Sequence, residues 1–178
     1  MDEPILTYWI DLNNCIIRIE GEFSNFSTEE MPFSLSKDTW QGSNLLSLIE
    51  GDDSKMFYEV LLQRVRILQK PYEFTYRCDS PGIARFMRMR LSPESGNLVR
   101  FENFLENESN SLPRIRFYQG DVHSTKRCSI CNRLKSGHQW VDLMDENIFY
   151  KDTLTSWAVD YTICPDCMNK LPLTRKIY

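Results

Sequence analysis

Four of the six cysteines in this 178-residue chain stand as two Cys-x-x-Cys pairs in its last third. The pairs are Cys128 with Cys131, and Cys164 with Cys167. Two thiolates three positions apart can bind one ion from the same side, and two such pairs complete the four-sulfur tetrahedron that zinc prefers. The spacing therefore predicts that these four cysteines form a structural zinc site. It also requires two distant segments of the chain to meet.

The stretch between the two pairs, residues 132–163, is longer than the roughly 15–20 residues that separate the pairs of the commonest zinc ribbons. A longer insert needs structure of its own. Its apolar residues predict a short packed element and then a strand that leads into the second pair. These residues are Trp140, Leu143 and Ile148 for the packed element, and Trp157, Val159 and Tyr161 for the strand.

Other interpretations of the cysteines stay open at this stage. Iron is accepted by four-cysteine sites as well as zinc. A thiol redox switch usually needs only one exposed pair near the start of a helix, so two pairs make it less favoured. The two histidines, His123 and His138, are reserve ligands that we expect to be bystanders, because four thiols are available.

Charge divides the chain into two parts. Residues 1–110 contain 11 Lys and Arg against 18 Asp and Glu, whereas residues 111–178 contain 10 against 7. The change of sign falls at the polar run ENESNSLP (106–113), which predicts a domain boundary. The basic part is short enough for burial alone to leave it marginally stable, and a structural zinc ion would supply about 10–16 kcal/mol of apparent binding free energy.

Nucleic-acid binding by the basic part is possible but not favoured. Zinc held by four thiolates carries a net charge of about −2, which lowers the positive charge of this segment. The acidic part is not expected to attract nucleic acid by its overall field.

Composition indicates a soluble, cytoplasmic protein. The hydrophobic and charged fractions, 42% and 26%, are typical of a globular domain, and no apolar run approaches the ~18 residues that a membrane span needs. The start of the chain, MDEPILTYWI, lacks the basic flank of a secretory signal. In the cytoplasm thiols stay reduced, so the cysteine pairs point to metal or redox chemistry rather than to disulfides.

The first 108 residues predict an α+β domain with one antiparallel sheet. TYWID and CIIRIE flank LNN, so we expect a hairpin that places Cys15, Ile17 and Ile19 on one face. A helix is expected after EGDDS, where an Asp or Ser would cap the first amides, and it would end at Pro71. Its predicted apolar stripe consists of Phe57, Val60, Leu61, Val65 and Leu68.

Three more strands are predicted in YEFTYRC, ARFMRMRL and LVRFENFL, where Met87, Met89 and Leu91 alternate with polar or aromatic residues. The arginines of this region are interpreted as a sheet face balanced by nearby carboxylates, with an anion site as the less favoured alternative. They are Arg77, Arg85, Arg88, Arg90 and Arg100. Cys15 and Cys78 are interpreted as small buried hydrophobic residues on strands.

The segments YWIDLNNCIIRIEGEF and FTYRCDSPGIARFMRMRLSP, together with the C-x-x-C … W … ICP-x-C ending, resemble one group of bacterial PAS-like proteins. The resemblance covers most of the chain, although residues 24–42 match poorly. It implies a PAS-like antiparallel sheet with flanking helices, which binds a small molecule or a partner and passes the change on. Relatives often have SHGICPDC at the second pair, whereas this chain has DYTICPDC, with Tyr161 and Thr162 in place of His-Gly.

The common PAS cofactors do not fit the residues. Haem in this fold usually takes a histidine ligand, and both histidines lie outside the PAS-like segment. The reactive cysteine of LOV-type flavin sensors stands in a Gly-x-Asn-Cys-Arg-Phe-Leu-Gln motif, which Cys15 lacks. Both cofactors are therefore disfavoured.

No Ser-His-Asp or Cys-His arrangement and no Gly-rich phosphate loop stands in the sequence, and a four-cysteine site has no open position for water. We therefore expect no enzyme activity. We expect a PAS-like domain at 1–108, a linker at 109–122 and a zinc-ribbon-like, four-cysteine module at 123–178. The predicted function is a sensory or interaction module of bacterial signal transduction, with an unidentified protein partner, a small-molecule ligand as a possibility, and homodimerisation as a further possibility.

Overall fold

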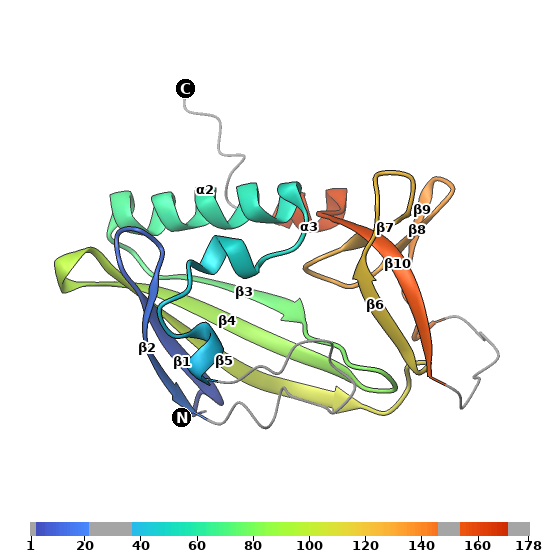
Figure 1. The fold of residues 1–178 in the computed structure, drawn as a ribbon, viewed down its shortest axis with the longest axis horizontal. Coiled ribbons are helices and arrows are strands. Elements are labelled where there is room, and N and C mark those ends of the chain that lie inside the picture. The colour runs from blue at the N-terminus through green and yellow to red at the C-terminus, as the bar shows by residue number, and fades with distance from the viewer. Residues whose placement is uncertain (1–2, 22–36, 146–153, 171–178) are drawn as a thin grey trace.

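The computed structural model describes residues 3–21, 37–145 and 154–170, which form two five-stranded sheets and the helices beside them (Figure 1). The first sheet has the order β2-β1-β5-β4-β3, and all its neighbouring strands are antiparallel. Its strands are β1 (Leu6–Ile10), β2 (Ile16–Gly21), β3 (Tyr72–Arg77), β4 (Ala84–Glu94) and β5 (Leu98–Ser109). The α+β class and the antiparallel first sheet are confirmed.

Asparagine makes the turn between β1 and β2, as predicted. Asn14 has a φ of 62°, a conformation that asparagine tolerates better than most residues. The carboxylate of Asp11 accepts hydrogen bonds from the backbone N–H groups of Asn13 at 2.9 Å and Cys15 at 2.8 Å. The turn is thus closed by the side chain that precedes it.

The predicted side-chain faces of β2 are wrong. Ile16 and Ile19 are buried, whereas Ile17 is 43% exposed. The pairing register shifts where Trp9 and Ile10 meet β2, so that Ile17 is an extra residue in a β-bulge. A bulge interrupts the alternation of faces, and simple period-2 reasoning fails there.

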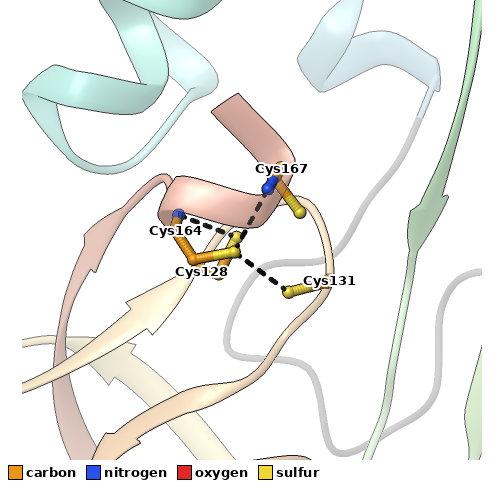
Figure 2. A group of neighbouring side chains, drawn as sticks. All are labelled: Cys128, Cys131, Cys164 and Cys167. Carbon is orange, nitrogen blue, oxygen red and sulfur yellow. Dashed lines mark hydrogen bonds between the residues drawn. The ribbon is translucent and has the colours of Figure 1, made fainter. Parts of the chain in front are cut away.

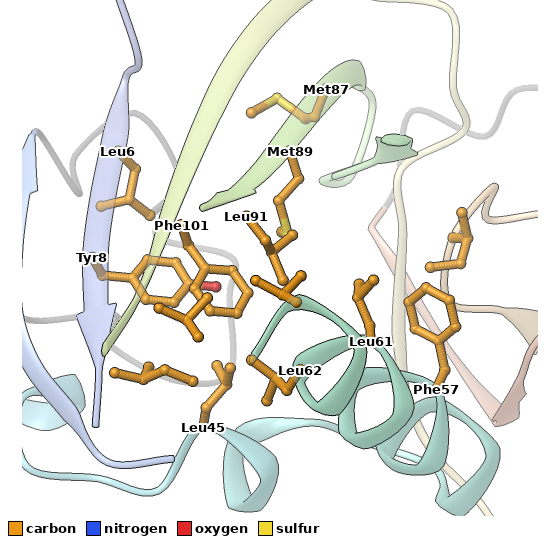
Figure 3. Close-up of a cluster of buried hydrophobic side chains, with 14 of the residues drawn as sticks. Leu6, Tyr8, Leu45, Phe57, Leu61, Leu62, Met87, Met89, Leu91 and Phe101 are labelled. Atoms are coloured by element: carbon orange, nitrogen blue, oxygen red, sulfur yellow. The ribbon is translucent and has the colours of Figure 1, made fainter. Parts of the chain in front are cut away.

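Three of the described helices lie between β2 and β3 in the chain: α1 (Lys37–Trp40), the 3-10 helix η2 (Leu45–Leu48) and α2 (Asp52–Leu68). Helix α2 runs along one face of the first sheet (Figure 1). Figure 3 shows Phe57, Leu61 and Leu62 of α2 pointing toward side chains of β1, β4 and β5, among them Leu91 and Phe101. This layer of apolar side chains is the main core.

The buried stripe of α2 is displaced from the prediction. Three of its five predicted members are buried, namely Phe57, Leu61 and Val65. Val60 is 38% exposed and Leu68 is 48% exposed, whereas Leu62 is buried. Leu62 lies on the flank of the helix that packs against Leu45 of η2, and Leu68 is the last residue of the helix. Packing against η2 therefore decides which flank is buried.

The predicted side-chain cap of α2 is wrong. The capping position is Gly51, with a φ of 79° and no side-chain cap. The side chains expected to cap the helix bind the second sheet instead. The hydroxyl of Thr162 donates a hydrogen bond to the carboxylate of Asp53, and the hydroxyls of Ser54 and Ser129 lie 2.6 Å apart.

The strands β3, β4 and β5 form the predicted meander. Met87, Met89 and Leu91 are buried, and Phe74 and Tyr76 pack against the same core. Asn97 of the short 3-10 helix η3 (Ser95–Asn97), between β4 and β5, has a φ of 62°.

Four of the meander arginines are paired with carboxylates, as the favoured interpretation predicted. The pairs are Arg77–Asp79 at 2.8 Å, Arg85–Glu108 at 2.8 Å, Arg88–Glu106 at 2.7 Å and Arg100–Glu94 at 3.2 Å. Arg77 and Arg85 are only 8% and 7% exposed, so these two are buried rather than solvated.

The second sheet has the order β6-β10-β7-β8-β9, with β10 parallel to both of its neighbours. Its strands are β6 (Ile115–Gln119), β7 (Thr125–Cys128), β8 (Leu134–Ser136), β9 (Gln139–Val141) and β10 (Thr155–Thr162), and helix α3 (Pro165–Lys170) follows β10. The predicted strand before the second cysteine pair is confirmed as β10. Leu143 of the predicted packed element is buried beside Leu134 and Val159, whereas Ile148 lies outside the described residues.

Strand β6 lies within residues 109–122, the stretch expected to be a linker. The polar run before it marks only the exposed end of β5. Ile115 and Phe117 then pair with Thr155 and Trp157 of β10 and pack on the small core of the second sheet.

Candidate metal centre

The four cysteines of the two pairs lie together at one end of the second sheet (Figure 2). Cys128 is the last residue of β7, and Cys131 lies in the turn that follows. Cys164 comes directly before α3, and Cys167 lies in its first turn. The structure thus brings together all four residues that the sequence singled out.

The parallel pairing of β7 and β10 is what joins the two pairs. In this register Thr162 lies opposite Cys128, and the N–H of Ser129 donates to the carbonyl oxygen of Thr162 at 2.8 Å. Both strands therefore end at the same edge, and each is followed by a cysteine pair. Parallel neighbours need a crossover connection of a dozen residues or more, which accounts for the long insert between the pairs.

The sulfur atoms have the spacing of a tetrahedral metal site. All four lie within 4.8 Å of one another, and the Cys131 and Cys164 sulfurs are 3.7 Å apart. Four sulfurs at about 2.3 Å from a central zinc ion would be about 3.8 Å from one another. The cluster therefore has the right size for one ion.

Backbone groups hold the sulfurs in place. The N–H of Cys164 points at the Cys128 sulfur at 3.3 Å, and the N–H of Cys167 points at the Cys164 sulfur at 3.4 Å. The first turn closes through the N–H of Asn132, which donates to the carbonyl oxygen of Cys128 at 2.9 Å. Asn132 has a φ of 61°, which asparagine accepts. Such N–H···S contacts orient thiolates and stabilise their charge.

The crowded thiols shift each other's pKa when no ion is bound. Hydrogen bonds from Cys131 and Cys167 lower the pKa of Cys128, because they stabilise its thiolate. The same contact with Cys128 raises the pKa of Cys131 to about 12. One thiolate thus forms readily while its neighbour keeps its proton, and a cation is needed to ionise the whole set.

The cluster is part of the main core. Cys128, Cys164 and Cys167 are buried in the same hydrophobic cluster as Phe57 and Leu61 of α2, and Cys131 is half-buried beside them. Backbone bonds cross the junction as well. The N–H of Arg77 at the end of β3 donates to the carbonyl oxygen of Ile130 at 2.7 Å.

A buried ionic network lies next to the cluster and was not predicted as a unit. Arg77 binds Asp79 with two nitrogens at 2.8 and 2.9 Å, and Asp142 of the second sheet with a third nitrogen at 3.0 Å. Arg127, the residue before Cys128, lies 3.9 Å from Asp79. The sequence showed the charges, but the partners are far apart in the chain, and no local pattern could have paired them.

The remaining sulfur and imidazole groups lie elsewhere. His123 and His138 are exposed and are not members of the cluster, in keeping with the expectation that they are bystanders. All six cysteines are described and free. Cys15 and Cys78 are half-buried rather than fully buried, and burial raises the pKa of Cys78 to about 11.

No model of a known protein family matches this sequence, and neither a curated protein nor a solved structure matches the chain. The PAS-like identity therefore stays a prediction. Among the described helices, none combines the length and the apolar character that crossing a bilayer requires.

Proposed function

We propose that this protein is a non-enzymatic, PAS-like sensory or interaction module of bacterial signal transduction, in which a structural zinc ion joins the two sheets. The observation that carries the proposal is the position of the cysteine cluster. Three of its cysteines are buried in the core that α2 shares with the first sheet, and the fourth, Cys131, packs against that core. Binding of a ligand or partner at one sheet would therefore change the packing at the other sheet.

The donor set favours zinc in a structural role. Four sulfurs from the two Cys-x-x-Cys turns complete the first coordination shell of a tetrahedrally bound ion. Such a shell leaves no open position for water or substrate. Bound at Cys128, Cys131, Cys164 and Cys167, the ion would neutralise thiolate charge and fix the ends of β7 and β10. Iron is the alternative ion for the same ligands.

Two features support the PAS-like part of the proposal. The first sheet is antiparallel, and along the chain two strands are followed by helices and then by a three-stranded meander, which is the element order that the sequence resemblance implies. Helix α2 covers one face of that sheet with large side chains, Phe57, Leu61 and Leu62 among them (Figure 3). A cytoplasmic location is part of the proposal, since all six thiols are free.

The charges around the first cysteine pair support the proposal over a nucleic-acid-binding ribbon. Lys126 pairs with Asp160 at 3.2 Å, and Arg133 pairs with Asp166 at 3.4 Å. Arg127 is buried. Basic side chains that are engaged within the chain have less to offer to phosphates.

Native mass spectrometry of freshly purified, reduced protein tests the proposal. We expect one zinc ion per chain together with a retained small molecule, a homodimer or both. A folded, metal-free monomer without any retained molecule would contradict the proposal. Filter binding at low salt should detect no DNA or RNA, and mild peroxide should produce neither a disulfide nor zinc release. Salt-sensitive retention would favour the nucleic-acid interpretation, and a disulfide would favour the redox switch.

A further inference from the structure

A cleft of about 500 Å³ lies where the two sheets meet. The turn after β3 forms one side of it, with Asp79, Ser80 and Pro81. Strand β6 and the flanks of the first cysteine pair form the other side, with Phe117, Arg127 and Asn132 among the lining residues. The volume is in the range of small-molecule sites, which is about 300–1,000 Å³.

One wall of this cleft is apolar. Leu112, Ile115 and Leu143 lie along it and belong to the small core of the second sheet. Phe117 adds an aromatic ring that stacks on Trp157, with ring centroids 6.1 Å apart. Such a wall suits the hydrocarbon body of a ligand.

Arg127 is a buried cation whose polar contacts are weak. It is 8% exposed, and its guanidinium lies 4.0 Å above the ring of Phe117. Its contacts with Tyr161 Oη and Asp79 Oδ2 are long, 3.4 and 3.9 Å. Within the described part of the chain, the Nε atom of Arg127 is buried without a hydrogen-bond partner. Buried guanidinium groups normally use their donors.

The acidic residues of the cleft do not give Arg127 a close hydrogen-bond partner. Asp79 is bound by two nitrogens of Arg77 at 2.8 and 2.9 Å, and it also accepts the N–H of Arg85 at 3.2 Å. Asp142 accepts Arg77 at 3.0 Å and the N–H of Met144 at 3.1 Å. Glu50 is the third carboxylate on the lining. Three carboxylates oppose a ligand with several negative charges, but unused guanidinium donors favour a single one.

We propose that this cleft binds a small organic monocarboxylate, with its carboxylate at the guanidinium of Arg127 and its apolar body along Leu112, Ile115 and Leu143. The site lies outside the layer between α2 and the first sheet. This ligand class would be the signal of the proposed sensory function, on which the inference rests. The shape of the cleft depends on the structural metal, because Arg127 and Asn132 flank the first cysteine pair. A ligand in the cleft would contact Arg127 and Asn132, the residues on either side of the turn that holds Cys128 and Cys131.

A titration with phenylacetate, followed by ¹H–¹⁵N NMR of the full chain, tests the proposal, and phenylacetamide is its neutral probe of equal size. We expect saturable shifts near Phe117 and Asn132 with a Kd of about 1 mM, a value reasonable for a ligand of about ten non-hydrogen atoms. Phenylacetamide should bind at least about tenfold more weakly, because it cannot form charge-assisted hydrogen bonds. Equal affinity for both probes, or no saturable shift, would overturn the proposal.

Two variants locate the site, and zinc content is measured on each. Arg127→Met should weaken phenylacetate binding by about tenfold, and Leu112→Ala, on the apolar wall, by about fivefold. Arg90→Met, at an exposed position of β4 away from the lining, should leave it unchanged. If Arg127→Met loses zinc, the result for Leu112→Ala decides whether the site exists. Unchanged binding in the zinc-loaded variants would refute the site. A wild-type chain that binds phenylacetate without metal would support the cleft and contradict the structural zinc.

Discussion

Thr162 lies opposite Cys128 in the parallel pairing of β10 and β7. Cys128 is the first residue of one cysteine pair, and Cys164, two residues after Thr162, is the first residue of the other. The hydroxyl of Thr162 also donates a hydrogen bond to the carboxylate of Asp53 at the start of α2. One residue thus ties the metal centre to the helix that covers the first sheet. The second sheet is therefore anchored in two ways, by the sulfur cluster and by contacts with α2 and β3.

Removing one sulfur should release the metal and destabilise the whole chain. In Cys164→Ala we expect loss of stoichiometric zinc and a fall of about 5 kcal/mol or more in the free energy of unfolding, because a structural zinc site supplies about 10–16 kcal/mol. Metal analysis and urea unfolding measure both quantities. Cys15→Ala is the matched control. Cys15 is outside the cluster, so this variant protein should keep its zinc. A Cys164→Ala protein with unchanged metal content and stability would count against the site.

Gly51 should not tolerate a side chain. Its φ is 79°, and a Cβ at this position would lie 2.2 Å from the backbone oxygen of Tyr161. We expect Gly51→Ala to lower the free energy of unfolding by more than about 3 kcal/mol. A positive φ at alanine costs about 1–3 kcal/mol by itself, and the backbone near Tyr161 must also move to make room for the Cβ. Gly42→Ala provides the comparison, since Gly42 has a φ of 87° with nothing near its Cβ position. Equal losses in thermal or urea unfolding would show that the contact with Tyr161 is unimportant.

The buried cation Arg77 should be needed for the junction of the two sheets. Arg77→Met leaves Asp79 and Asp142 without their main partner, and breaking a buried ion pair costs about 3–5 kcal/mol. Lys126→Met removes the more exposed pair with Asp160 and should cost about 1 kcal/mol or less. Urea unfolding of the two variants at neutral pH makes the comparison. Similar small losses would mean that the network adds little to the junction.

Cys78 should make the fold sensitive to alkaline pH. Burial raises its pKa in the folded chain to about 11, from 9.0 in the ordinary thiol. The unfolded chain therefore loses this proton first, and stability that is present below about pH 9 is lost as the pH rises to about 11. A shift of this size corresponds to roughly 2–3 kcal/mol.

Unfolding at pH 8 and at about pH 10.5 measures this contribution. The fall in stability between the two pH values should be smaller by about 2 kcal/mol in Cys78→Ala than in the natural sequence. The buried tyrosines Tyr8, Tyr58 and Tyr76 also have raised pKa values, and burial, the largest cause for each, is the same in both proteins. Cys78 adds a smaller rise to the pKa of Tyr58 and of Tyr76, so the difference between the proteins includes this coupling. An identical alkaline loss in both proteins would show that Cys78 is not the group responsible.

Local patterns predicted the parts of the fold that depend on neighbouring residues. Two Cys-x-x-Cys pairs were enough to predict that four sulfurs meet, because the spacing itself makes each pair a bidentate ligand. Met87, Met89 and Leu91 were placed correctly because β4 is regular and buried on one face. The turn at Asn14 followed from the tolerance of asparagine for a positive φ.

Long-range packing determined what the sequence did not show. The bulge at Ile17 depends on how β1 meets β2, and the burial of Leu62 rather than Val60 depends on η2. The parallel pairing of β7 with β10 joins residues more than thirty positions apart. The sequence of neither strand indicates whether the two strands pair in a parallel or an antiparallel orientation. Strand β6 follows directly after the polar run and was not predicted, because composition indicates exposure and not strand pairing.

Zinc K-edge X-ray absorption of the purified, reduced protein measures the first coordination shell directly. We expect one zinc ion per chain with four sulfur neighbours at about 2.3 Å and no nitrogen or oxygen in the first shell. A folded protein that contains no metal, or a shell with fewer than four sulfurs, would contradict the central claim that Cys128, Cys131, Cys164 and Cys167 together hold a single structural ion.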